Sequence, residues 1–151
     1  MTSKKLQPEN RATSKKGKKD TMNLPPHLTA LAEKVLQGLM GQVRGAVAAV
    51  VSTVDGFDVA SHVENSAAGA KLAAMASSIS AICSVVGEES QVGAHRSISI
   101  EAENGYVVMV NIAHSANPMI LNLVADKTAV LAQMVYFARQ AAQQMEVGEA
   151  L

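Results

Sequence analysis

The side chains of this sequence that could carry out nucleophilic catalysis are few. The single cysteine, Cys83, would need a histidine as its base, and the candidates are His62, His95 and His114. Cys83 lies among apolar residues, however, where a thiol is usually inert packing. We therefore expect no catalytic cysteine.

Two nearby carboxylates, Asp55 and Asp58, are the other arrangement that could serve an enzyme. Asp55 is followed by Gly56, and this dipeptide is a strong signal for a tight turn between two strands. We interpret Asp55 as a turn residue and Asp58 as a strand end. The sequence thus predicts a protein that is not an enzyme and has no catalytic residues.

Metal and nucleotide sites are equally unsupported. No two histidines have HxH or HxxxH spacing, and one cysteine excludes a cysteine-rich metal site. Gly38, Gly41 and Gly45 are not followed by the Gly-Lys-Ser/Thr sequence that completes a phosphate-binding loop. We expect no metal ion, no cofactor and no small-molecule substrate.

The charge of the chain is divided between two segments. Residues 1–20 hold seven basic and two acidic residues, whereas residues 21–151 hold six basic and eleven acidic ones. A polar, basic segment cannot bury enough apolar surface to offset its ordering entropy, so residues 1–22 are expected to form a disordered tail. This tail is either a solubilising extension or a weak contact for nucleic acid or an anionic membrane. Its basic residues are Lys4, Lys5, Arg11, Lys15, Lys16, Lys18 and Lys19.

We expect a cytoplasmic location by default. No run of about 18 apolar residues is present, so we expect no membrane span, and the N-terminus has no apolar region typical of a secretory signal. Two tyrosines, two phenylalanines and no tryptophan leave little aromatic surface for stacking on bases or sugars.

The stretch from Ser66 to Val86 predicts a helix that is apolar on two opposite faces. We expect the large face to lie on a sheet and the small face to contact a second backbone, because a solvated face would carry charge. The alternative is a core helix whose small face lies under a loop. The large face comprises Leu72, Met75, Ile79, Ile82 and Val86, and the small face Ala70, Ala74, Ser77, Ala81 and Ser84.

The elements around this helix predict an α+β domain. Helical periodicity follows Pro25 and Pro26, two strands flank the Asp55-Gly56 turn, and two further strands flank an Asn104-Gly105 turn. Strand 119–125 follows, and a last helix begins at Lys127 with Asp126 as its N-cap. The order is α-β-β-α-β-β-β-α, a five-stranded antiparallel sheet with helices on both faces. Residues 23–145 are expected to form this single domain, and residues 146–151 a frayed end.

The strand that ends at Ala102 alternates polar and apolar residues and follows the two-faced helix directly. Edge strands are templates for pairing with another chain. A symmetric dimer that joins two such edges would also bring two central helices together. We therefore assign Arg96 and Ile98 to the dimer interface, together with the small face of the central helix.

The chain resembles the roadblock (dynein light chain) family, whose bacterial members act with small Ras-like GTPases. The resemblance covers roughly residues 28–145. It rests on the element order, on the Ala/Ser-rich helix and on the Val43–Gly56 hairpin (Val-Arg-Gly-Ala-Val-Ala-Ala-Val-Val-Ser-x-x-Asp-Gly). It also rests on the hairpin of residues 98–113, on the Asn117-Pro118 strand start that follows it, and on the Ala125-Asp126 helix entry. It implies a profilin-like fold, a homodimer with a ten-stranded sheet and paired central helices, and no catalytic centre.

Two functions remain open after this comparison. The first is a homodimeric, non-catalytic regulator or scaffold of a small Ras-like GTPase, which it would contact through Lys71, Ser78, Glu88 and Glu89. The second is a structural adaptor that bridges assemblies or an anionic surface through the basic tail, with no GTPase partner. An arginine finger is a weaker hypothesis. Its candidates, Arg44, Arg96 and Arg139, are more readily explained as solvated or sheet-edge residues.

Overall fold

The computed structural model describes residues 24–148, and the elements follow in the predicted order. The predicted α+β fold with a five-stranded antiparallel sheet is confirmed. The elements are α1 (Pro26–Gln42), β1 (Ala46–Thr53), β2 (Asp58–His62), α2 (Ser66–Glu89), β3 (Ser97–Ala102), β4 (Gly105–Ile112), β5 (Met119–Asp126) and α3 (Leu131–Val147).

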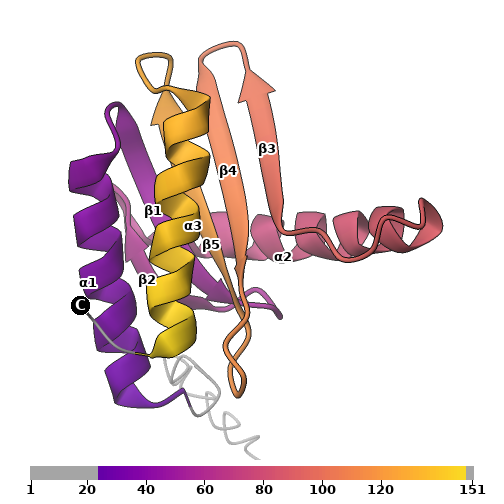
Figure 1. Ribbon diagram of the computed structural model, residues 1–151. Helices are drawn as coiled ribbons and strands as arrows, with labels where there is room; N and C mark the ends of the chain where they lie inside the picture. Colours follow the sequence, from indigo (N-terminus) through magenta and orange to yellow (C-terminus); the bar gives the residue numbers. More distant parts are fainter. Residues whose placement is uncertain (1–23, 149–151) are drawn as a thin grey trace, which may run out of the picture.

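The sheet separates two layers of helices. Its strand order is β2-β1-β5-β4-β3, and every neighbouring pair is antiparallel. Helices α1 and α3 lie side by side on one face, and α2 crosses the other face (Figure 1). β2 and β3 are therefore the two edges of the sheet.

The main core lies between the sheet and the pair α1–α3, because alternate residues of each strand point to that side. On β4, Val108, Val110 and Ile112 belong to this core, whereas Met109 points to the α2 side. On α1, Leu28, Leu31, Val35 and Leu39 recur at helical spacing and are buried. Pro26 occupies the start of the helix, where its missing N–H costs nothing.

The start of the last helix differs from the prediction. Asp126 ends β5, and its Oδ1 accepts hydrogen bonds from the Thr128 backbone N–H at 2.9 Å and the Thr128 hydroxyl at 2.6 Å. The Asp126 carboxylate is engaged in this local turn and does not cap a helix at Lys127, so α3 begins only at Leu131. The helix then continues to Val147, two residues into the segment expected to fray.

Candidate functional site

The predicted orientation of α2 on the sheet is wrong. Its buried residues are Gly69, Ala73, Ala76 and Gly87, so α2 approaches the sheet through small side chains. Ala76 packs with Met109 and Ile120, and Ile79 and Ile98 lie at the margin of this contact. Small residues allow the helix backbone to come close to the strands, which explains why they form the sheet side.

The large apolar side chains of α2 point mostly outward instead. Met75, Ile82, Val85 and Val86 are between 51% and 64% exposed. Leu72 and Ile79, from the same predicted stripe, are half-buried at its margin. The large predicted stripe thus points mostly away from the sheet, and the single chain leaves it largely uncovered.

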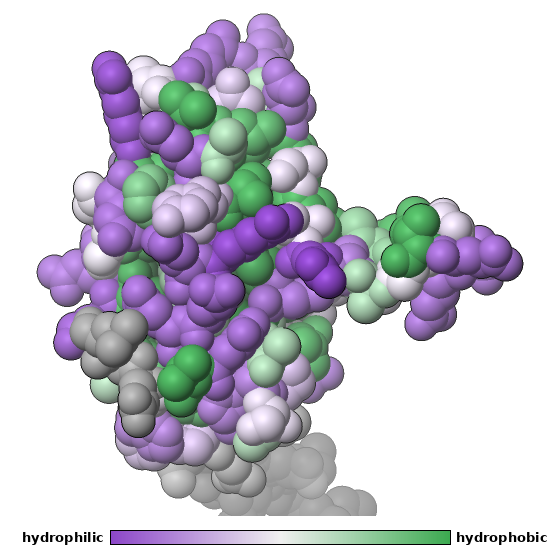
Figure 2. All heavy atoms as spheres, viewed as in Figure 1, coloured by the Kyte–Doolittle hydropathy of each residue, from purple (hydrophilic) through white to green (hydrophobic). Residues whose placement is uncertain are grey.

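The C-terminal half of α2 extends beyond the β3 edge (Figure 1). Apolar residues lie along this projecting part, and hydrophilic residues gather at its tip (Figure 2). The return loop, residues 90–96, runs back along the helix to β3. Its amides of Val92 and Gly93 donate to the Gly87 carbonyl at 3.1 and 3.2 Å. A Cβ at Gly87 would lie 2.1 Å from the Gly93 carbonyl oxygen, so the close contact requires glycine.

The residues assigned to the small face separate into two groups. Ala70, Ala74 and Ala81 are exposed on α2 beside the outward apolar residues. Ser77 and Ser84 are half-buried and engaged within the chain, since the Ser77 hydroxyl donates to the Val54 carbonyl at 2.6 Å and the Ser84 hydroxyl to the Ser80 carbonyl at 3.0 Å. Three alanines and not the two serines are therefore available to a second molecule.

The remaining predicted contact residues lie on the same side of the molecule or at the β3 edge. Arg96 is exposed just before β3, and Ile98 is half-buried on the α2 side of that strand. The four residues assigned to a protein partner are all exposed on α2: Lys71, Ser78, Glu88 and Glu89.

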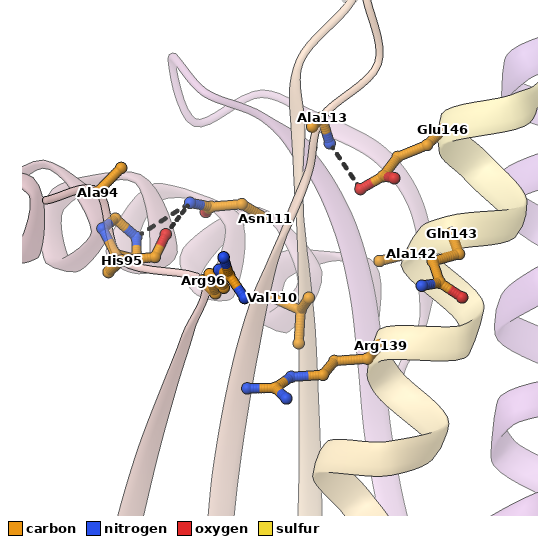
Figure 3. Close-up of a pocket in the computed structure, with 10 residues that line it drawn as sticks. All are labelled: Ala94, His95, Arg96, Val110, Asn111, Ala113, Arg139, Ala142, Gln143 and Glu146. Atoms are coloured by element: carbon orange, nitrogen blue, oxygen red, sulfur yellow. Dashed lines mark hydrogen bonds between the residues drawn. The ribbon is translucent and has the colours of Figure 1, made fainter.

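A cluster around His95 joins the return loop to α2 and β4 (Figure 3). His95 Nε2 lies 3.2 Å from Ser80 Oγ and 3.2 Å from Asn111 Nδ2, and Asn111 Nδ2 also donates to the His95 carbonyl at 3.1 Å. His95 Nδ1 lies 3.5 Å from Ser84 Oγ. Sequence reasoning missed this cluster, although the spacing of Ser80 and Ser84, one helical turn apart, was an available signal.

The geometry of this cluster is that of a structural link between the return loop, α2 and β4. Each ring nitrogen of His95 faces a serine on α2, and Asn111 fixes the loop backbone as well as the ring. The hydrogen bonds recorded for His95 within residues 24–148 involve Ser80, Ser84 and Asn111 and do not include Cys83. The suggested Cys83–histidine pair is not assembled at this site.

A cavity of about 500 Å³ opens beside this cluster, between the start of β3, β4 and the C-terminal half of α3. Arg139 reaches across it from α3 and donates through Nη2 to Ser97 Oγ on β3 at 3.1 Å. At the other end of the cavity, Glu146 Oε1 accepts a hydrogen bond from the Ala113 amide at 3.2 Å. Figure 3 shows both side chains directed from α3 toward the sheet. The Arg139 contact ties α3 to the β3 edge, and the Glu146 contact ties it to the end of β4.

Within residues 24–148 no group of three or more histidine, cysteine, aspartate or glutamate residues could hold a metal ion. α2 is the one helix of this described part that is long and apolar enough to cross a membrane by length and composition alone. Its contacts with β1, β2 and β5 fit a helix that packs on a sheet.

Comparison with known proteins identifies a family that this chain matches. The Roadblock/LC7 domain family model matches residues 32–117, more than half of the chain. No curated protein sequence matches significantly.

Several solved structures have the same fold. The Roadblock/LC7 domain from Streptomyces avermitilis superposes with a TM-score of 0.70 and 18% identity, covering 76% of this chain and 94% of that one. The gliding protein MglB from Thermus thermophilus gives a TM-score of 0.72 at 18% identity and covers 83% and 93%. An MglB structure described as having a tetrameric arrangement gives 0.73 at 19% identity and covers 83% and 92%.

Proposed function

This chain belongs to the Roadblock/LC7 domain family, and on that premise we propose that it is a homodimeric, non-catalytic regulator or scaffold of a small Ras-like GTPase. It acts in the cytoplasm and modulates the nucleotide cycle of its partner. The resemblance to family members that act with such GTPases supports this function. The neighbour described as tetrameric supports self-association.

The observation that carries the proposal is the uncovered apolar side of α2 next to a free sheet edge. Four large apolar side chains lie more than half exposed on one helix, and exposed apolar patches mark interaction sites. A second copy covers them when two α2 helices lie side by side and two β3 strands join. Ala70, Ala74 and Ala81 lie beside these residues and let the two helices approach closely.

The GTPase binds exposed polar residues of α2. Lys71 and Ser78 lie on the exposed side of α2, and Glu88 and Glu89 end the helix at the projecting tip. A partner that binds one conformation of the GTPase switch segments better than the other shifts the population toward it. This binding changes hydrolysis or nucleotide exchange without a catalytic group in the chain itself.

The test is capture from the native lysate with the full chain, in parallel lysates supplied with GDP or a non-hydrolysable GTP analogue. We expect mass spectrometry to identify a small GTPase that is retained more in one nucleotide state. Substituting Glu88→Lys and Glu89→Lys together should reduce its capture, whereas Glu33→Lys, exposed on α1, should not. Absence of any GTPase from both eluates would contradict the proposal.

The second function, an adaptor that acts through a basic tail, is favoured by the excess of five positive charges in residues 1–20. Those residues lie outside the described part of the chain. In this proposal residues 1–22 form a unit separate from the single domain that follows. Replacing the seven basic residues with glutamine in the full chain should abolish binding by the adaptor and leave GTPase capture unchanged.

A further inference from the structure

The hydrogen-bonding pattern of β3 determines which of its backbone groups face the free edge. The Asn111 amide donates to the Arg96 carbonyl at 3.4 Å, and the same ladder pairs Ile98 with Met109 and Ile100 with Val107. Directly opposite residues of an antiparallel pair exchange hydrogen bonds at every second position. Arg96, Ile98 and Ile100 therefore bond to β4, and the N–H and C=O groups of Ser97, Ser99 and Glu101 point outward.

The symmetry of the dimer restricts how two such edges can meet; this step rests on the homodimer proposed above. Opposite residues in an antiparallel pair point to the same face of the sheet. Both α2 helices stay on one face only if each β3 residue is opposite a residue of the same face. The twofold axis must then lie between the two β3 strands at the level of one residue, so that this residue is opposite its own copy.

The ladder favours one of these positions. An axis at Ser99 places Ser99 opposite itself and Ser97 opposite Glu101 of the partner subunit, so all three outward-facing residues form hydrogen bonds. An axis at Ile98 or Ile100 pairs only two of the three within β3. Unpaired backbone groups next to a neighbouring chain are costly, so the axis at Ser99 gives the most complete joint.

The side chains on the α3 side of the sheet support the same register. Ser97 accepts a hydrogen bond from Arg139 Nη2 at 3.1 Å, which holds the guanidinium over the start of β3. With the axis at Ser99, the carboxylate opposite Ser97 is Glu101 of the partner subunit. The carboxylate of Glu101 of the partner subunit then lies beside the guanidinium of Arg139, and symmetry gives two such pairs in each dimer.

The apolar side of the strand agrees with this arrangement. Ile98 and Ile100 point to the α2 side, where Ile98 packs near Ala76 and Met109. With the axis at Ser99, Ile98 lies opposite Ile100 of the partner subunit in a pair without hydrogen bonds. Such pairs bring the side chains closest, with Cα atoms about 4.5 Å apart.

We propose that two copies join through β3 with the twofold axis at Ser99, and that Glu101 of each copy pairs with Arg139 of the other. Arg139 and Glu101 are thereby residues that set the register and specificity of self-association. The pairing also explains why a long side chain from α3 is held over a strand at the sheet edge.

Charge reversal tests the ion pair. Glu101→Arg or Arg139→Glu alone should weaken dimerisation about tenfold, since each places like charges together at two symmetric sites. The double variant should restore it. Glu64→Arg and Lys127→Glu, both exposed and distant from β3 in the chain, are the matched controls. Single variants without effect, or a double variant that stays weak, would overturn the pairing.

Cysteine cross-linking tests the register independently. In the full chain with Cys83→Ser, Ser99→Cys should form a disulfide with its own copy on mild oxidation, because opposite Cα atoms about 5.5 Å apart permit one. Ile98→Cys should link to Ile100→Cys in a mixture but not to itself. Self-linking of Ile98→Cys or Ile100→Cys in place of Ser99→Cys would overturn the register. A wild-type chain that stays monomeric would instead contradict the proposed homodimer.

Discussion

At the level of single residues, His95 holds the projecting part of α2 to the rest of the molecule. The Asn111 Nδ2 group can only donate, and it lies 3.2 Å from His95 Nε2 and donates to the His95 carbonyl at 3.1 Å. His95 Nδ1 faces Ser84 Oγ at 3.5 Å. One side chain thus links the return loop to α2 and β4.

Replacing this side chain should loosen the return loop. We expect His95→Ala to lower the free energy of unfolding by about 1–2 kcal/mol, because its hydrogen bonds to Ser80 and Asn111 are lost. Amide exchange at Val92 and Gly93 should become faster than in wild type. His27→Ala, exposed at the start of α1, is the control. Unchanged exchange at both amides would show that His95 does not hold the loop.

Asp126 gives a second prediction for a single residue. The hydroxyl and the amide of Thr128 lower the pKa of the Asp126 carboxyl by donating to it, and Arg44 adds a smaller effect of the same sign. A carboxyl with a lowered folded-state pKa stabilises the fold above its unfolded pKa. This contribution is lost as the pH falls through the folded value.

Thr128→Val removes the hydroxyl and keeps the shape of the side chain. The pKa of Asp126 should rise toward its ordinary value, and the acid-dependent loss of stability should become shallower. Carboxyl chemical shifts followed by NMR over pH 2–6, about the range in which aspartate titrates, measure the pKa directly. Thr29→Val on α1 serves as the control. An unchanged Asp126 titration would exclude the Thr128 hydroxyl as the cause.

At the level of elements, sequence patterns predicted the fold more accurately than they predicted the surfaces. Turn signals at Asp55-Gly56 and Asn104-Gly105 and alternation in the strands were sufficient to place all eight elements in order. The boundary of α3 was missed because Asp126 and Thr128 form a local turn, which competes with helix capping.

The orientation of α2 could not be predicted from its two stripes. Hydropathy shows that the helix is apolar on more than one side, but it does not show which side meets the chain's own sheet. Here Ala73 and Ala76 meet the sheet, and Met75 and Ile82 point outward. The exposed alanines of the small stripe and Arg96 remain predicted interface residues.

The close contact at the end of α2 gives a paired prediction for two helical glycines. Gly87→Ala should destabilise the protein by about 1–3 kcal/mol, because the new methyl group would meet the Gly93 carbonyl oxygen. Gly38→Ala on α1, where a Cβ would meet nothing within 4 Å, should stabilise it by about 1 kcal/mol through helix propensity. Urea unfolding measures both. Stabilisation by Gly87→Ala would contradict the described contact.

At the level of the whole molecule, the outward side of α2 should lie between two copies. Ile82→Glu places a charge where the proposed contact buries an apolar side chain, so it should dissociate the dimer. Ala81→Glu, one residue earlier on the exposed side, should do the same. Val130→Glu, an equally exposed apolar position before α3, should leave the dimer intact. Dimers of unchanged stability in both α2 variants, measured by light scattering after size exclusion, would place the interface elsewhere.

We propose further that the GTPase contacts the α2 helices of both copies, so the loss of the dimer should also remove GTPase binding. A variant that is monomeric but folded separates the two proposals. If Ile82→Glu is monomeric by light scattering and still captures the GTPase in the nucleotide-dependent assay, each subunit binds alone.

The most direct test of this account is the mass of the full chain in solution, measured by sedimentation equilibrium over a range of micromolar concentrations. The uncovered side of α2 and the free β3 edge predict a species of twice the 15.7 kDa chain mass, or a multiple of that dimer. A single species of 15.7 kDa across the whole range would contradict it, since those apolar side chains would then remain exposed to water.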